Sequence, residues 1–129
     1  MARATQVTVV LDNKVGALSK LCSALKRAKV NVQAISVVDT ADTCAVRLLA
    51  QPSPRAVKAL RKSGASVSTQ PVVTAKLVNK PGALAAAAGK LAKAKVNIHY
   101  CYGSAQAAGK PALVVFAVDK PAKAARVLG

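Results

Sequence analysis

The sequence predicts an α+β fold made of two ferredoxin-like βαββαβ units side by side, each an antiparallel sheet with helices on one face. First, residues 13–18 and 79–84 are nearly identical, and ten of nineteen positions from 13 to 31 recur at a constant offset of 66. A repeat of this period indicates two similar supersecondary units. Second, strand and helix patterns alternate in the ferredoxin-like order. Third, Gln70 and Pro71 join the copies without a linker, which holds the units close together.

The first unit is predicted to cover residues 1–70. Runs rich in β-branched residues predict strands over 5–11, 30–38, 43–50 and 66–69. An apolar stripe at helical spacing predicts an amphipathic first helix and consists of Leu18, Leu21, Cys22, Leu25 and Ala28. A second helix is bounded by Ser53 as N-cap, Pro54 at the first helical position and Gly64 after the last turn.

The second unit is predicted to cover residues 71–129 and to be incomplete. Strands are expected over 71–78, 96–103 and 111–118, and helices over 83–94 and 120–128, the last capped by Asp119. The sequence leaves no room for a fourth strand. We therefore expect one sheet edge to be open or to be covered by a neighbouring chain.

The charge is strongly positive, at +16 from 20 Lys and Arg against four Asp and no Glu. One alternative function is therefore a basic ferredoxin-like RNA-binding domain. Such domains stack bases on aromatics of the central strands, and here Phe116 is the one aromatic in a predicted central strand. Tyr100 and Tyr102 share one face of another strand, where packing is the expected role. Because many cations end predicted helices and complement the helix dipole, we expect solvated faces and no nucleic acid.

The residues for metal or acid–base chemistry are few. Cys22, Cys44 and Cys101 have no Cys-x-x-Cys spacing, and His99 is the single histidine. This excludes a four-ligand zinc site, and we expect three buried, reduced thiols in a cytoplasmic protein. The sequence contains no run of ~18–20 apolar residues and no nucleotide-binding glycine loop. We therefore predict a protein that is not an enzyme, carries no cofactor and does not bind a membrane.

The repeated loop carries the chemistry of a small-molecule site. Gly16 and Gly82 permit a sharp turn, and the unpaired amides that open the following helix attract a carboxylate. Asn13 and Asn79 each offer amide donors and an acceptor, which suits a zwitterion. Asn and Gly also form ordinary turns, so the residues alone leave open a structural dimerisation module without a ligand.

The loop Asn-Lys-Pro-Gly-Ala-Leu, followed by a helix and Val-Asn-Ile, resembles the ACT domain. The resemblance covers both repeats and is closest to stand-alone tandem ACT proteins. It implies a non-catalytic, allosteric regulatory protein that senses an amino acid at the interface between ACT-type units, with a homodimer and a regulated enzyme as expected partners. Carried over residue by residue, the implied ligand-binding positions are Asn13, Gly16, Ala17, Leu18 and Asn31 in the first copy, and Asn79, Gly82, Ala83, Leu84 and Asn97 in the second.

In some members of the family, the loop Asn of one unit and the Asn that opens strand 2 of its neighbour both contact the ligand. That implies a pairing of the loop residues Asn13 and Asn79 with Asn31 and Asn97, each 18 residues further along. The copies differ in one respect, because Val15 stands where the second loop has Pro81. The second loop therefore keeps the fuller match.

Overall fold

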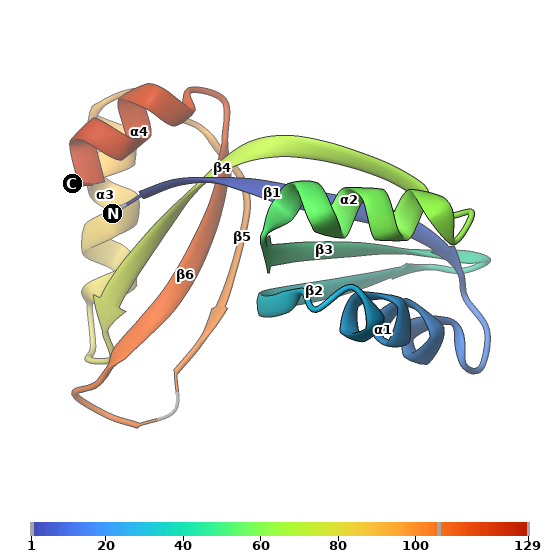
Figure 1. The fold of residues 1–129 in the computed structure, drawn as a ribbon. Coiled ribbons are helices and arrows are strands. Elements are labelled where there is room, and N and C mark those ends of the chain that lie inside the picture. The colour runs from blue at the N-terminus through green and yellow to red at the C-terminus, as the bar shows by residue number, and fades with distance from the viewer. Residues whose placement is uncertain (1, 106, 129) are drawn as a thin grey trace. The chain divides into compact units, whose positions relative to one another are not determined.

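The computed structural model describes residues 2–105 and 107–128, which form two compact units (Figure 1). The first unit holds residues 5–70, and the second holds residues 2–4 together with 71–128. The division crosses two long strands, β1 (Ala2–Asp12) and β4 (Ser66–Val78). The predicted strands 66–69 and 71–78 are thus one continuous strand that serves both units.

The first unit has the predicted βαββαβ order. After β1 come α1 (Ala17–Arg27), β2 (Asn31–Thr40), β3 (Thr43–Gln51), α2 (Ser53–Lys62) and the beginning of β4. The strand order is β2-β3-β1-β4, and β3 pairs antiparallel with both β1 and β2. This arrangement leaves β2 at the edge of the sheet.

Both helices of the first unit pack on one face of its sheet. Its hydrophobic core joins Leu21 and Leu25 of α1 and Ala56 and Leu60 of α2 to strand residues that include Val7, Val9, Val46 and Leu48. The buried stripe of α1 is narrower than predicted. Leu18 is 40% exposed and Cys22 is exposed, whereas Ala24 is buried.

The second unit repeats this architecture with its own core. Its elements are the rest of β4, then α3 (Ala83–Lys93), β5 (Ile98–Ser104), β6 (Pro111–Val118) and α4 (Pro121–Leu128). The strand order is β1-β4-β6-β5, with antiparallel pairing of β6 to both β4 and β5. The buried core residues of this unit are Val73, Ala75, Ala87, Leu91, Val96, Phe116, Val118 and Ala124.

The start of β1 occupies the β4 edge of the second unit. No strand follows α4 within the described residues, but β4 is hydrogen-bonded to β1 as well as to β6. Residues 2–4 of β1 belong to this unit and lie at that edge. Our expectation that the edge is open or covered by a neighbouring chain is therefore wrong. Our predicted first strand began at residue 5. It missed the extension because Ala2, Arg3 and Ala4 carry no strand pattern of their own.

Two further predictions are wrong in detail. The thiols are not buried, since Cys22 and Cys101 are exposed and Cys44 is half-buried. Asp119 is not the N-cap of α4, because α4 begins at Pro121 and the Lys120 carbonyl accepts its first helical hydrogen bond; Asp119 Oδ1 instead accepts a 2.9 Å hydrogen bond from the backbone N–H of Asn97. Gly64 follows α2 with a φ of 89°, the left-handed conformation expected of a glycine at this place.

Among the described residues, no helix has the length and apolar character that crossing a membrane requires.

Candidate functional site

The two repeated loops have the same backbone conformation. Gly16 and Gly82, the N-cap residues of α1 and α3, both have φ 87° and ψ −8°, and neither helix has a side-chain cap. In each loop the first helical amide donates to the carbonyl of the Lys three residues earlier, at 3.3 Å. A residue other than glycine would be strained at this φ, which explains why the repeat keeps both glycines.

Asn13 holds the first loop onto the β2–β3 turn. Its Nδ2 atom donates to Asp39 Oδ1 at 2.8 Å and to the Ala41 carbonyl at 2.9 Å. Its backbone N–H donates to the Asp42 carbonyl, also at 2.9 Å. Both side-chain hydrogens of Asn13 are therefore used inside the protein, and a ligand would have to compete for them.

Asn79 holds the second loop onto a longer turn between β5 and β6. Its backbone N–H donates to Lys110 and its carbonyl accepts from Gly109, both at 2.9 Å. Its Nδ2 atom donates to the Ala107 carbonyl at 3.1 Å. The residue 66 positions after Asp39 is Ala105, which has no side-chain acceptor. Among the described residues Asn79 Nδ2 thus makes one hydrogen bond where Asn13 makes two.

The repeated Ala-Lys-Val-Asn segments end the two helices. Lys29 and Lys95 have φ values of 57° and 59°. Lys29 N–H donates to Lys26 and Val30 N–H donates to Leu25, both at 3.0 Å, and the second copy shows the same two bonds. This is the Schellman arrangement, with Val30 packed in the same core as Leu25. Most of this repeat therefore has a structural explanation.

Asn31 and Asn97 are exposed residues at the beginning of the next strand. Asn31 is the first residue of β2 and pairs with Gln51. Asn97 exchanges two hydrogen bonds with Asp119, through its backbone N–H and its carbonyl. Neither Asn lines a described cavity of its unit. Their role toward a ligand remains a prediction.

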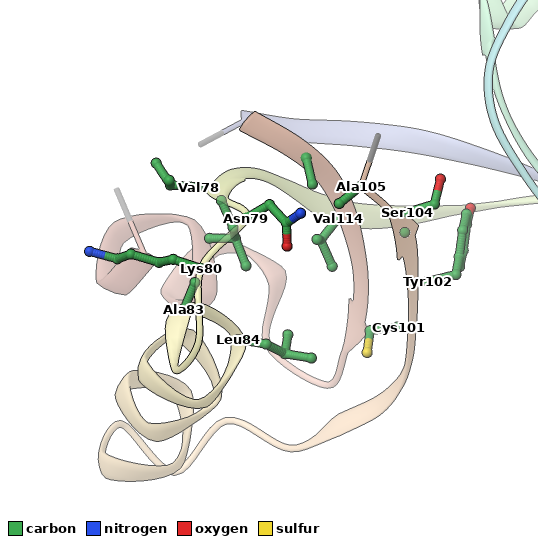
Figure 2. A pocket seen from close by; sticks show the side chains of 13 residues that line it. Val78, Asn79, Lys80, Ala83, Leu84, Cys101, Tyr102, Ser104, Ala105 and Val114 are labelled. Carbon is green, nitrogen blue, oxygen red and sulfur yellow. The ribbon is translucent and has the colours of Figure 1, made fainter. Parts of the chain in front are cut away.

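A cavity of about 340 Å³ lies beside the second loop and is called the Asn79 pocket here. Three predicted site residues line it, namely Asn79, Ala83 and Leu84 (Figure 2). The other lining residues are Leu77, Val78, Lys80, Cys101, Tyr102, Gly103, Ser104, Ala105, Ala112 and Val114. Gly82 shapes the loop without lining the pocket.

The corresponding loop of the first unit contributes fewer residues to a cavity than the second loop does. Ala17 lines a separate cavity of about 640 Å³ that also involves Lys14, Lys20 and Arg27 of the same unit. Asn13, Gly16 and Leu18 line neither of these two cavities.

Strand β5 forms the far wall of the Asn79 pocket. Cys101 stands opposite the fully buried Phe116 of β6, so its side chain lies on the core face of the sheet. Tyr100 and Tyr102 alternate to the other face, where their rings stack with centroids 6.5 Å apart. Cys101 and Ser104 were not predicted as site residues, and for Tyr102 packing was favoured over a place in a pocket. A sequence signal was lacking because this strand is not part of the repeated loop.

The electrostatics of the Asn79 pocket suit an anionic group at one end. The described residues that line the pocket include no carboxylate, and the first turn of α3 has no acidic residue. No acidic side chain in the first turn of α3 therefore neutralises the positive end of the helix dipole at its amides. Figure 2 shows the Asn79 amide directed toward Val114, whereas the Lys80 side chain extends out of the pocket.

Known structures share the fold of the chain. Protein BT0572 from Bacteroides thetaiotaomicron is 31% identical, with a TM-score of 0.90, over 98% of this chain and 86% of that one. The regulatory subunit of aspartate kinase from Thermus thermophilus is 16% identical, with a TM-score of 0.70, over 98% and 95%. Aspartate kinase from Clostridium acetobutylicum is 15% identical, with a TM-score of 0.55, over 98% and 33%. The last two likenesses show the fold alone.

Curated proteins gave no match to the sequence. The sequence model of the ACT domain pair matches residues 2–128, nearly the whole chain. The two-unit fold and the paired glycine loops agree with that match. The chain therefore belongs to the ACT domain pair family.

Proposed function

We propose that this protein is a non-catalytic regulatory module that binds a free amino acid in the Asn79 pocket. The observation that carries the proposal is the coincidence of this cavity with the repeated loop and with the uncapped start of α3. Its volume of about 340 Å³ lies at the lower end of the range for small-molecule sites, roughly 300–1,000 Å³.

The two charged groups of an amino acid would each have a partner in this pocket. The ligand carboxylate is bound by the first-turn amides of α3 that follow Ala83, whose own amide donates to Lys80, because these amides point outward at the positive end of the dipole. The ligand ammonium donates to Asn79 Oδ1, a neutral acceptor beside the same loop. Leu84 and Ala83 of α3 contact the carbon atoms of the ligand that lie between its carboxylate and its ammonium group.

We propose one principal site per chain, at the second loop. This choice is supported by the hydrogen bonds of Asn13 to Asp39 and Ala41, which occupy both of its amide hydrogens. Asn79 donates once among the described residues, so binding a ligand there disturbs fewer internal bonds.

Isothermal calorimetry and thermal shift against the twenty amino acids test the proposal. At a free concentration 100 times its Kd, a ligand stabilises the protein by about 2.7 kcal/mol. Asn79→Ala should weaken binding, whereas Asn13→Ala, its counterpart in the repeat, should leave the Kd within about twofold. If no amino acid shifts the melting temperature or gives heat, the proposal fails.

We further propose that the protein is a homodimer that pairs through β2. This edge strand exposes Val32, Ile35, Val37 and Val38 by 37–46% and carries no Lys or Arg, although the chain has 20. Edge strands that stay unpaired in solution usually carry such charges. Light scattering of Val37→Lys should show a monomer where the unmodified protein is a dimer; a monomeric unmodified protein contradicts the proposal. We also propose that the protein regulates a partner enzyme according to whether the Asn79 pocket is occupied; the Thermus protein of the same fold is named as a regulatory subunit of aspartate kinase.

A further inference from the structure

We infer that the Asn79 pocket selects an amino acid with an uncharged aliphatic side chain, of the valine, leucine and isoleucine class. The inference rests on the proposed function and names the ligand class for that site. It follows from three properties of the lining residues, which are exposed apolar surface, the absence of acidic groups and the direction of the polar groups present.

The first property is exposed apolar surface on the pocket wall. Val78 is 45% exposed and Leu84 is 51% exposed. These are the exposed large hydrophobic residues of the second unit within its described residues, and both line this pocket. Leu77, Ala112 and Val114 continue the apolar wall. An aliphatic side chain of a ligand removes this surface from water, which is favourable in proportion to the apolar area that is buried.

The second property is the lack of any carboxylate for a cationic side chain. Residues 71–128 contain a single acidic residue, Asp119. Asp119 is held by the backbone of Asn97 and does not line the pocket. A lysine or arginine side chain would therefore lose water without gaining a counter-ion, which is strongly unfavourable.

The third property is the direction of the polar side chains. Lys80, the cation among the lining residues, extends out of the pocket in Figure 2, and the Ser104 hydroxyl points away from Leu84. The end of the pocket between Leu84 and Cys101 is left with aliphatic carbons and a thiol, a weak hydrogen-bonding group. An acidic or hydroxylated ligand side chain at this end finds no strong partner.

Matched ligand pairs test the selectivity by calorimetry on the unmodified protein. Valine and threonine have the same shape, and a hydrophobic pocket discriminates against the added hydroxyl by about 100-fold. We expect valine or leucine to bind and threonine, lysine and aspartate to bind at least tenfold more weakly. If threonine, lysine or aspartate binds as tightly as the aliphatic amino acids, this inference is wrong while the proposed function stands. If none of them binds, and no other amino acid does, the proposed function itself fails.

An added carboxylate should shift the preference toward lysine. Leu84→Asp places an acid in the first turn of α3, where it also favours the helix, so folding is not at risk. A charged hydrogen bond contributes enough for the leucine-to-lysine affinity ratio to fall by about tenfold or more. The matched control is Leu18→Asp, the same position in the first repeat and outside the pocket. Cys101→Asp on the facing strand is a second variant with the same expectation. An unchanged ratio in both pocket variants overturns the inference.

Discussion

Replacing Gly82 by Ala tests whether the repeated loop conformation is the physical reason for the repeated glycine. Gly82 has a φ of 87°, and a Cβ built on it meets no atom within 4 Å. The substitution therefore adds no steric clash with the rest of the protein. Any loss of stability must come from the left-handed backbone itself.

The expected loss follows from two opposing effects. An L-residue in the left-handed region costs about 1–2 kcal/mol. Removing a glycine from the unfolded chain returns about 0.4–1 kcal/mol, because the unfolded state then has fewer conformations. Gly82→Ala should thus lower the free energy of unfolding by about 0.8 kcal/mol, the difference between the midpoints of these two ranges. For a chain of this length, that corresponds to a decrease of about 3 °C in Tm.

Gly89 in the interior of α3 is the matched control. A Cβ there also meets nothing within 4 Å, but its backbone is helical. Gly89→Ala should therefore raise the free energy of unfolding by about 0.8–1 kcal/mol. Urea and thermal unfolding followed by far-UV circular dichroism measure both variants. If Gly82→Ala is neutral or stabilising while Gly89→Ala behaves as expected, the explanation of the repeat by backbone strain is refuted.

Four other substitutions test different parts of the structure by the same unfolding measurements. Lys95→Gly relieves a positive φ and should stabilise the protein by about 0.5–1 kcal/mol; destabilisation would contradict the Schellman assignment. Gly103→Ala places a Cβ 2.6 Å from the Leu113 carbonyl, so a loss of about 1–3 kcal/mol is expected, and full stability would show that β5 and β6 are not paired in this register. Leu60→Ala and Leu91→Ala each empty a fully buried position and should cost about 2–5 kcal/mol; a cost below 1 kcal/mol would place that side chain outside its core.

The elements of the fold could be predicted because each carries a local signal. Strand runs such as 43–50 and 111–118 are rich in β-branched residues, and the structure places β3 and β6 there within one residue. The repeat then gives the architecture, since two copies of one unit must have the same topology. The end of a helix could also be predicted where a glycine follows it, as Gly64 follows α2.

The exchange of strand ends between the units could not be predicted. Residues 2–4 complete the second unit because β1 continues beyond the first, and the sequence has no feature that marks where one strand changes partner. The exposure of Cys22 was missed for a related reason. Periodicity defines a stripe on α1 but not its width, which depends on the elements that pack against the helix.

The repeat locates the loop of the candidate site, but identity between its two copies does not identify the residues that bind a ligand. The ten identical positions include Gly16, Gly82 and the helix ends, whose roles in the structure are conformational. Identity between the copies at these positions is therefore explained by the backbone conformation that both loops adopt. The proposed function depends instead on a difference between them, because Asp39 accepts a hydrogen bond from the Asn13 amide, whereas Ala105, the residue 66 positions later, has no side-chain acceptor. Asp39→Ala should accordingly free an Asn13 amide hydrogen without creating the apolar wall that Val78 and Leu84 provide, so no second binding event is expected in calorimetry. A second site in that variant would show that the asparagine, rather than the pocket wall, determines binding.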